Sequence, residues 1–303
     1  MKECKVTDHY GHNLHVYVFD DVEDVIGVFQ LVHGVNEHGL RYKEFAEFLN
    51  EQGYVVYIHD HVSQGKSRIP LDKDVVNFGK HGDKVLVDGV NVVRKQIRDD
   101  YPESDIFAFG HSLGALILRK YLMDYDNEYK KIILNGTGYA DTKGIGLVIC
   151  IGRFLKIFGN GPSSFFDNIF RQTQLKLNEK VKINHFIEWL TRDEEYTKKN
   201  LSDKFLYIRL TKGSFISLLR LVKNVNNLNL INKRYGNKLD ILLLSGTHDP
   251  STDFGVGTNK LNTIFNELRL NSSCILYDEG RHDTIQETNR GQVYTDVINY
   301  VKN

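Results

Sequence analysis

The sequence predicts an α/β fold with a mostly parallel central sheet, helices on both faces and a helical cap insertion. Three observations support this. Through the first 140 residues, short apolar runs alternate with segments of helical periodicity, as βαβ crossovers require. The alternation stops over residues 141–236, where helical signals occur without a clear strand, and it then resumes. We therefore expect residues 1–140 and 237–303 to form one core domain, and residues 141–236 to form its helical cap.

The first predicted elements are two strands and a helix. Residues 12–19 alternate at a period of two, whereas residues 25–34 form the continuous apolar run of a buried parallel strand. Aromatic residues and leucine recur at helical spacing in residues 42–53, and Gly53 ends that pattern. The same reasoning predicts strands over residues 54–60, 105–110 and 130–136, and helices over residues 85–100 and 113–125.

The predicted cap contains two well-marked helices. One opens at Thr191, which is expected to form a capping box with Glu194. The other, over residues 214–222, places an apolar stripe that includes Phe215 and Leu218 on one side. After the cap, the alternation predicts strands over residues 239–246 and 272–280, and helices over residues 259–268 and 292–302.

Composition argues against several classes of function. The 39 basic residues balance 39 acidic ones, which disfavours a nucleic-acid partner. Cys4, Cys150 and Cys274 are few, odd in number and far apart, which indicates a reducing compartment. The most apolar run, residues 144–159, is shorter than the roughly 20 residues that span a bilayer. Because residues 1–21 carry no apolar core of a secretory signal, we expect a cytoplasmic protein.

The stretch Gly110–Gly114 has the pattern G-x-S-x-G, with Ser112 at its centre. A predicted strand runs directly into it and a predicted helix runs directly out, which is the context of a nucleophile elbow. The flanking glycines let the backbone turn sharply without a Cβ clash. The alternative is a glycine-rich turn with an ordinary serine. A nucleophilic serine also needs a base to take its proton and a third group to orient that base.

The acid and the base are expected later in the chain, each just beyond a strand. Asp249 and His282 occupy these positions in the order serine, acid, histidine. Asp253 and Asp278 are alternative acids, and Asp249 is preferred because it follows its strand most directly and Pro250 would stiffen its turn.

The loop HGVNEHG, residues 33–39, contains two histidines and a glutamate and invites a metal interpretation. Zinc motifs of this kind hold their ligands on one helical face, which a glycine-bearing loop after a strand cannot provide. In a nucleophile-elbow enzyme the loop instead supplies a backbone amide to the oxyanion hole. The amides of Val35 and Leu113 are the expected donors, and neither a metal nor a cofactor is expected.

Together, several motifs resemble the α/β-hydrolase superfamily, and most closely its monoacylglycerol lipase and lysophospholipase branch, often labelled serine aminopeptidase-like. The resemblance covers nearly the whole chain outside the cap and implies Ser112 as nucleophile, Asp249 as acid, His282 as base and the Val35 and Leu113 amides as oxyanion donors. Ser63 stands where that family usually has glycine. The motifs are HGVNEHGLRY, IHDHVSQGKS, FGHSLGA, WLTRD, SGTHDP and EGRHD.

The resemblance implies a serine hydrolase that cleaves a small-molecule or monoacyl lipid ester through an acyl-enzyme. The apolar segment of residues 144–170 would line an acyl channel and touch a lipid surface transiently, or alternatively pack on the domain below. Trp189 is interpreted as a core residue and residues 192–195 as a solvated face. Two alternatives are a serine aminopeptidase, with Glu194 and Glu195 binding the substrate amine, and a catalytically silent binding module.

Overall fold

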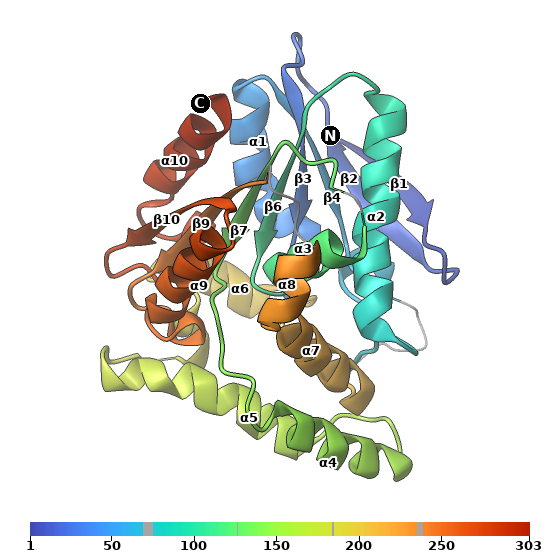
Figure 1. The fold of residues 1–303 in the computed structure, drawn as a ribbon, viewed down its shortest axis with the longest axis vertical. Coiled ribbons are helices and arrows are strands. Elements are labelled where there is room, and N and C mark those ends of the chain that lie inside the picture. The colour runs from blue at the N-terminus through green and yellow to red at the C-terminus, as the bar shows by residue number, and fades with distance from the viewer. Residues whose placement is uncertain (69–74, 126, 184, 235–238) are drawn as a thin grey trace.

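A computed structural model describes residues 1–68, 75–125, 127–183, 185–234 and 239–303 (Figure 1). In this part of the chain, one sheet has eight strands in the order β1-β2-β4-β3-β6-β7-β9-β10. Strand β2 pairs antiparallel with β1 and β4, and the other neighbours are parallel. The predicted α/β fold class is confirmed. The strands are β1 (Lys2–Thr7), β2 (Asn13–Phe19), β3 (Gly27–Val32), β4 (Tyr54–His59), β6 (Ile106–His111), β7 (Lys131–Asn135), β9 (Asp240–Gly246) and β10 (Asn271–Tyr277).

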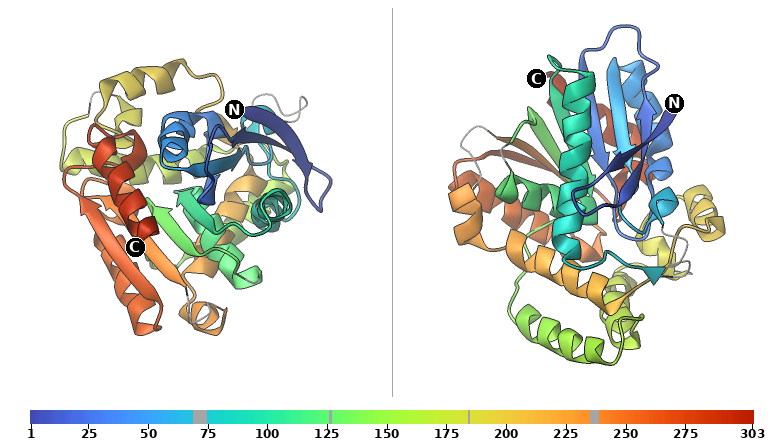
Figure 2. Two further views of the ribbon diagram at one scale, coloured as in Figure 1. Left: turned by 90° about the horizontal axis from the view of Figure 1, so that it is seen from above. Right: turned by 90° about the vertical axis from the view of Figure 1, so that its right-hand side faces the viewer.

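Helices cover both faces of the sheet (Figures 1 and 2). Helices α1 (Lys43–Glu51) and α10 (Arg290–Lys302) share one apolar core with one face of the sheet. Helices α2 (Gly82–Asp100), α3 (Leu113–Asp124) and α9 (Val256–Glu267) share a second core with the opposite face. Every residue of β3, β4 and β6 is buried, which explains why these strands are continuous apolar runs rather than alternating ones.

Helices predominate in the chain between β7 and β9, two strands that are neighbours in the sheet. Helices α4 and α5 lie at the end of the molecule farthest from the sheet, and α7 lies between them and the core (Figure 1). Helix α7 contacts α2 and α3 as well as α4. The predicted boundary at residues 236/237 lies outside the described residues, so the cap boundaries stay a prediction. The helices are α4 (Ile145–Ile157), α5 (Ser164–Leu175), α6 (Glu194–Ser202), α7 (Lys212–Val225) and α8 (Leu228–Arg234).

Two short segments were not predicted as strands. Val75–Val76 (β5) and Arg209–Leu210 (β8) form a separate parallel pair. Strand β1 was also not expected, because it is an edge strand whose side chains are mostly exposed and therefore carry little apolar periodicity. Within the described residues, no helix is long and apolar enough to cross a membrane.

The predicted capping box at Thr191 is wrong. Helix α6 begins at Glu194, and its N-cap is Asp193, whose carboxylate accepts hydrogen bonds from two amides of the first turn. The Thr191 hydroxyl instead donates to the backbone oxygen of Gln286 at 2.8 Å. A tertiary contact has therefore taken the side chain that the local pattern assigned to the helix.

The residues of the apolar stripe predicted for α7 pack in two directions, Leu218 against the core of the sheet and Phe215 against α4 and α5. Leu221 and Val225 are fully buried against α2 and α3, whereas Leu218 is only half-buried. Phe215 is buried and stacks on Phe166 of α5, with ring centroids 4.4 Å apart. Helix α7 thus has two apolar sides, one toward the core and one toward α4 and α5.

Candidate active site

Ser112 lies in the sharp turn between β6 and α3, with φ 52° and ψ −111°. A non-glycine residue in this region is strained, and such strain persists where the surrounding structure imposes it. Close backbone contacts explain the flanking glycines. A Cβ at Gly114 would lie 1.9 Å from the Val32 carbonyl oxygen, and one at Gly110 would lie 2.7 Å from the Gly114 oxygen. The Ser112 amide donates to the carbonyl of Asn135 at 2.9 Å, which ties the turn to β7.

The structure brings His282 and Asp249 together. The loops after β10 and β9 carry them, and His282 Nδ1 lies 2.9 Å from Asp249 Oδ2 with both side chains buried. The alternative acids lie apart from this pair. Asp253 and Asp278 are both exposed, and Asp278 accepts only a long hydrogen bond from Thr247, at 3.4 Å.

Ser112 and His282 line the same small cavity of about 60 Å³. Their side chains form no direct hydrogen bond within the described part of the structure, and contacts of this kind are often long until substrate binds. Val35 and Trp189 line the cavity as well. The predicted nucleophile, base and oxyanion loop therefore face one space.

Several groups surround the His282 ring. The indole of Trp189 stacks on it with centroids 4.6 Å apart, and the His111 ring lies at 4.8 Å. Burial lowers the pKa of His282, but the charge and hydrogen bond of Asp249 outweigh it, so the pKa is raised above 6.5. Burial alone would raise the pKa of Asp249, and its contacts with His282 and Ser251 lower it instead.

Ser251 is a member of this site that the sequence reasoning did not identify. Its hydroxyl lies 2.7 Å from Asp249 Oδ1 and 2.9 Å from His282 Nδ1, and its amide donates to the same carboxylate oxygen at 2.8 Å. Since Nδ1 of His282 carries a proton that points to Asp249, the Ser251 hydroxyl donates its own hydrogen to the Asp249 carboxylate. The Ser251 oxygen is then a second acceptor for the proton on Nδ1. The only signal in the sequence is its position two residues after the acid.

The two predicted oxyanion donors have backbone amides that make no hydrogen bond to protein groups in the described residues. Val35 follows β3, and Leu113 is the first residue of α3, where helix amides are left without an intrahelical partner. The Gly34 amide is not available to a substrate, because it donates to the Glu37 carboxylate. That bond helps to set the shape of the loop around Val35.

Glu37, which suggested a metal ligand in the sequence, binds protein groups. Its carboxylate pairs with Arg41 and accepts a hydrogen bond from Tyr42 at 2.9 Å. Burial opposes its ionisation, but the Arg41 charge together with the contacts of His111, the Gly34 amide and Tyr42 outweighs it, so the pKa of Glu37 is lowered. Arg41 also reaches Asp283 at 3.1 Å and Gln286 at 2.6 Å. The network joins the oxyanion loop, residues 33–39, to the loop of residues 278–289 that carries His282, which we call the histidine loop. Burial raises the pKa of Asp283 to about 7 despite the Arg41 charge.

Three buried histidines, His33, His59 and His61, are hydrogen-bonded in series to the start of the oxyanion loop. His33 Nδ1 bonds the Gly34 carbonyl at 2.7 Å, and His33 Nε2 accepts the His61 amide at 2.9 Å. His61 Nε2 bonds the His33 carbonyl at 3.0 Å, and His59 Nε2 lies 3.2 Å from His61 Nδ1. In this series of hydrogen bonds each ring donates through one nitrogen, so each of the three imidazoles carries one proton. Burial lowers the pKa of all three rings, that of His61 to about 4.

The turn that contains Ser63, where glycine is usual in the resembled family, has a backbone conformation that favours glycine. Ser63 has φ 63°, and its hydroxyl accepts the Asn77 amide at 2.9 Å. Next to it, the Asp60 carboxylate accepts the amides of Gly39 and Lys66, both at 2.7 Å. The backbone of Ser63 is therefore strained, and the hydrogen bonds of Ser63 and Asp60 hold the turn in this conformation.

A larger cavity of about 460 Å³ adjoins the small one. The two share Val35, Asn36, Gln174 and Tyr207. The larger one is lined mostly by apolar side chains of α5, α7 and β8 and the residues just before β8. The other lining residues are Phe166, Asp167, Arg171, Ile208, Arg209, Leu210, Phe215 and Leu218.

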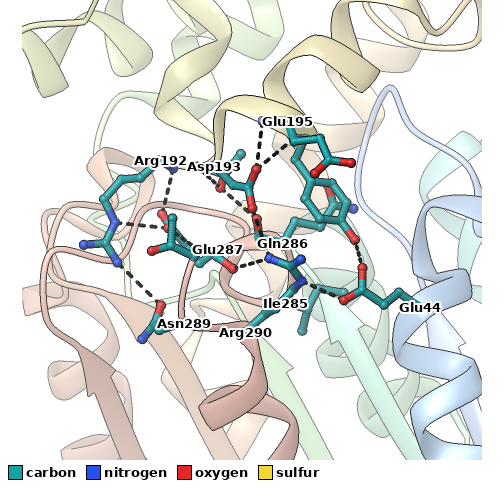
Figure 3. A network of polar contacts seen from close by, with 12 residues as sticks. Glu44, Arg192, Asp193, Glu195, Ile285, Gln286, Glu287, Asn289 and Arg290 are labelled. Atoms are coloured by element: carbon teal, nitrogen blue, oxygen red, sulfur yellow. Dashed lines mark hydrogen bonds and ion pairs between the residues drawn. The ribbon is translucent and has the colours of Figure 1, made fainter.

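The charged cluster interpreted as a solvated face divides into two parts. Arg192 pairs with the buried Glu287 at 3.0 Å, and Asp193 pairs with Arg290 at 3.0 Å, so both connect this segment to the histidine loop and α10 (Figure 3). Residues 194–195 are exposed and line neither cavity. The acidic pocket that an aminopeptidase would need is therefore not supplied by these two glutamates.

Comparisons with known proteins match this architecture. The sequence profile of the family described as serine aminopeptidase, S33, matches residues 23–289. The monoglyceride lipase homolog of monkeypox virus is 34% identical over 105 residues, or 34% of this chain and 35% of that protein. The probable lysophospholipase L2 of Haemophilus influenzae is 28% identical over 173 residues, or 54% of this chain and 51% of that protein. The chain thus spans about a third to a half of these curated relatives.

A solved structure extends the comparison to the whole fold. The highly thermostable carboxyl esterase from Bacillus coagulans, in complex with glycerol, superposes with a TM-score of 0.89 at 20% identity. The superposition covers 99% of this chain and 97% of that one. At this identity the match shows the fold, and the family profile covers most of the chain. The predicted resemblance is confirmed, and the chain belongs to the serine aminopeptidase, S33, family of α/β-hydrolases.

Proposed function

We propose that the protein is a serine hydrolase that cleaves carboxylic esters of monoacyl lipids, of the monoacylglycerol or lysophospholipid type. One observation carries the proposal: the buried His282–Asp249 pair, 2.9 Å apart, faces the cavity that Ser112 lines, and a largely apolar cavity adjoins it. The names of the two relatives, a monoglyceride lipase homolog and a probable lysophospholipase, support an ester of this class.

Acylation starts when the Ser112 hydroxyl attacks the ester carbonyl. The imidazole of His282 takes the hydroxyl proton at Nε2, because its hydrogen bond to Asp249 keeps the other proton on Nδ1. The oxygen of the tetrahedral intermediate becomes an anion between the Val35 and Leu113 amides. Loss of one such donor costs about 3 kcal/mol in other hydrolases, so the pair supplies a large part of the rate enhancement. His282 then gives its proton to the leaving alcohol.

Deacylation repeats these steps with water. His282 removes a proton from the water as the oxygen attacks the acyl-enzyme carbonyl, and it returns that proton to Ser112 as the fatty acid leaves. Because Asp249 and His282 are buried, water screens the attraction between the carboxylate and the imidazolium formed in each half-reaction only weakly.

The larger cavity is the proposed acyl site. Phe166, Phe215 and Leu218 provide an apolar wall, and the cavity meets the small one at Val35. An alkyl chain gains roughly 0.8 kcal/mol for each methylene group it buries, so longer chains should bind more tightly until the cavity is full.

Helix α4 is the proposed contact with the lipid surface. Its last turn and the C-cap Phe158 expose Phe154 (61%), Ile157 (77%) and Phe158 (76%) close together, which is unusual for large apolar side chains. Arg153 and Lys156 on the same helix provide positive charge, as expected of a helix that lies at an anionic lipid interface.

A substrate panel tests the proposal. We expect turnover of p-nitrophenyl esters to rise with chain length, and monoacylglycerols or lysophospholipids to be hydrolysed, with Ser112→Ala slower by about 10⁴-fold or more. Equal rates for Ser112→Ala and wild type would refute the serine mechanism. Cleavage of aminoacyl-naphthylamides without any ester activity would favour an aminopeptidase instead.

A further inference from the structure

The only tryptophan of the chain lies in the predicted cap and touches the proposed base. Trp189 ends the short helical turn Phe186–Trp189 and is buried. Its indole and the His282 imidazole are 4.6 Å apart at their centroids, and their planes differ by 23°. This is a face-to-face stack within the distance at which an aromatic ring also attracts a cation.

Backbone contacts fix the register of this stack. The His282 amide donates to the Trp189 carbonyl at 3.3 Å, and the next amide, that of Asp283, donates to the Leu190 carbonyl at 2.8 Å. The Arg281 guanidinium donates to the carbonyl of Thr191 at 3.1 Å. Residues 188–192, which we call the anchored segment, therefore run beside the histidine loop.

A buried carboxylate strengthens this junction. Glu287 is fully buried, and it accepts the Arg281 amide at 2.9 Å, the Arg192 amide at 3.1 Å and Arg192 Nε at 3.0 Å (Figure 3). Bonds to a charged acceptor are roughly twice as strong as neutral ones. The carboxylate thus binds both the anchored segment and the histidine loop, and the indole is held in place with them.

We propose that Trp189 is a positioning residue for the base, holding the His282 imidazole in the plane from which Nε2 can reach Ser112. This inference rests on the proposed role of His282. The contacts of the His282 ring with Asp249 and Ser251 are both made at Nδ1, and hydrogen bonds at a single ring atom leave rotation of the ring weakly restrained. An aromatic face stacked on the ring removes that freedom, and it favours the imidazolium that forms in each half-reaction.

Three carboxylates from neighbouring elements raise the pKa of this ring: Asp249 after β9, Asp283 in its own loop and Glu37 after β3. Arg41 pairs with both Glu37 and Asp283, and the His111 ring at the end of β6 faces His282 at 4.8 Å. Burial raises the pKa of the neighbouring Asp283 to about 7, so this carboxyl also titrates within the pH range of such a test. A test that uses pH must therefore compare the protein with a variant that lacks the imidazole alone.

Intrinsic fluorescence provides that test, because Trp189 is the only tryptophan. An imidazolium in contact with indole quenches its emission, whereas neutral imidazole does so weakly. We expect the emission of wild type to fall as the pH is lowered and His282 gains its proton, with a midpoint above pH 6.5, and that of His282→Gln to stay flat. A flat wild-type curve, or the same fall in both proteins, would overturn the proposal.

Kinetics provide the second readout. We expect Trp189→Leu to lower kcat by roughly 10- to 100-fold with KM changed less than about threefold, and Trp189→Phe to retain most of kcat. Ile187→Ala is the matched control, since Ile187 is buried in the same helical turn but lines neither cavity. It should lower the melting temperature and leave kcat near that of wild type.

The outcomes separate this inference from the proposed function. A Trp189→Leu enzyme with wild-type kcat, or an Ile187→Ala enzyme with an equal loss of kcat, would overturn the positioning role. If Ser112→Ala retained full esterase activity, the proposed function would fail, while the fluorescence of wild type and His282→Gln would still report the stack.

Discussion

Two parts of the chain between β7 and β9 differ in how they are held. Helices α4 and α5 lie at the end of the molecule (Figure 1), and α4 exposes large apolar side chains such as Phe154 and Ile157. The anchored segment, residues 188–192, is joined to the histidine loop by buried charge-assisted hydrogen bonds around Glu287. A segment predicted as a single cap thus contains one part that exposes apolar side chains, where we propose contact with a lipid surface, and another that is joined to the loop of the proposed base.

The largest expected effect is on the anchored segment. Glu287→Ala leaves Arg192 Nε and the amides of Arg281, Arg192 and Thr288 without their acceptor, which should lower the free energy of unfolding by about 3–5 kcal/mol and kcat by about 100-fold. Urea denaturation and ester turnover measure both. Glu279→Ala is the matched control, because the exposed Glu279 pairs with the same guanidinium at 3.1 Å. A comparable loss in Glu279→Ala would contradict the distinction between a buried anchor and a surface pair.

The complementary effect is expected on α4. Replacing Phe154, Ile157 and Phe158 together by serine should lower hydrolysis of monoacylglycerol in vesicles about 10-fold, because the protein loses the apolar side chains that would insert at the interface. Turnover of a short soluble ester should not change. Val256→Ser, an exposed apolar position on α9, is the control. Equal loss on both substrates would mean that this face serves folding or the acyl site rather than the lipid surface.

Acid should destabilise the core rather than α4 and α5, which contain no histidine. Burial lowers the pKa of His33, His59 and His61 in the folded state, so their stabilising effect is complete above about pH 6.5 and is lost as pH falls toward 4. The midpoint of urea unfolding should therefore decrease from about pH 7 to about pH 5. His59→Leu removes one of these groups and should make the decrease shallower. A slope equal to that of wild type would exclude the histidine chain as its source.

The smallest effect is expected at Ser251. Its hydroxyl adds a second acceptor at His282 Nδ1 and a donor to Asp249, so Ser251→Ala should lower kcat only about 3- to 10-fold. In an Asp249→Asn background the same substitution should have almost no effect, because the two groups act together. Additive losses in the double variant would show that Ser251 acts independently of the acid.

Much of the fold could be predicted because its signals are local. The buried strands β3, β4 and β6 are continuous apolar runs, and the G-x-S-x-G turn lies between a strand and a helix that are each well marked. Ser112, Asp249 and His282 could be expected to lie near one another, because crossover connections bring the carboxyl ends of parallel strands to one edge of the sheet. Strand β1 escaped prediction because it is exposed and therefore lacks periodicity.

The contacts that distinguish this site could not be predicted, since they join distant parts of the chain. Thr191 and Glu194 fit a capping box in the sequence, yet the hydroxyl of Thr191 bonds a carbonyl 95 residues away. Trp189 could be recognised as buried, but nothing near it in the sequence indicates the ring against which it packs. In the same way, Glu37 resembles a metal ligand until Arg41 and the Gly34 amide are found at its carboxylate.

The central claim is that Ser112 carries the acyl group of the substrate. Mass spectrometry of the protein quenched in acid during turnover of a slow p-nitrophenyl acyl ester measures this directly. We predict a mass increase equal to the acyl group, located on the peptide that contains Ser112 and absent from Ser112→Ala. Turnover without any adduct, or an adduct on another residue that persists in Ser112→Ala, would contradict the account.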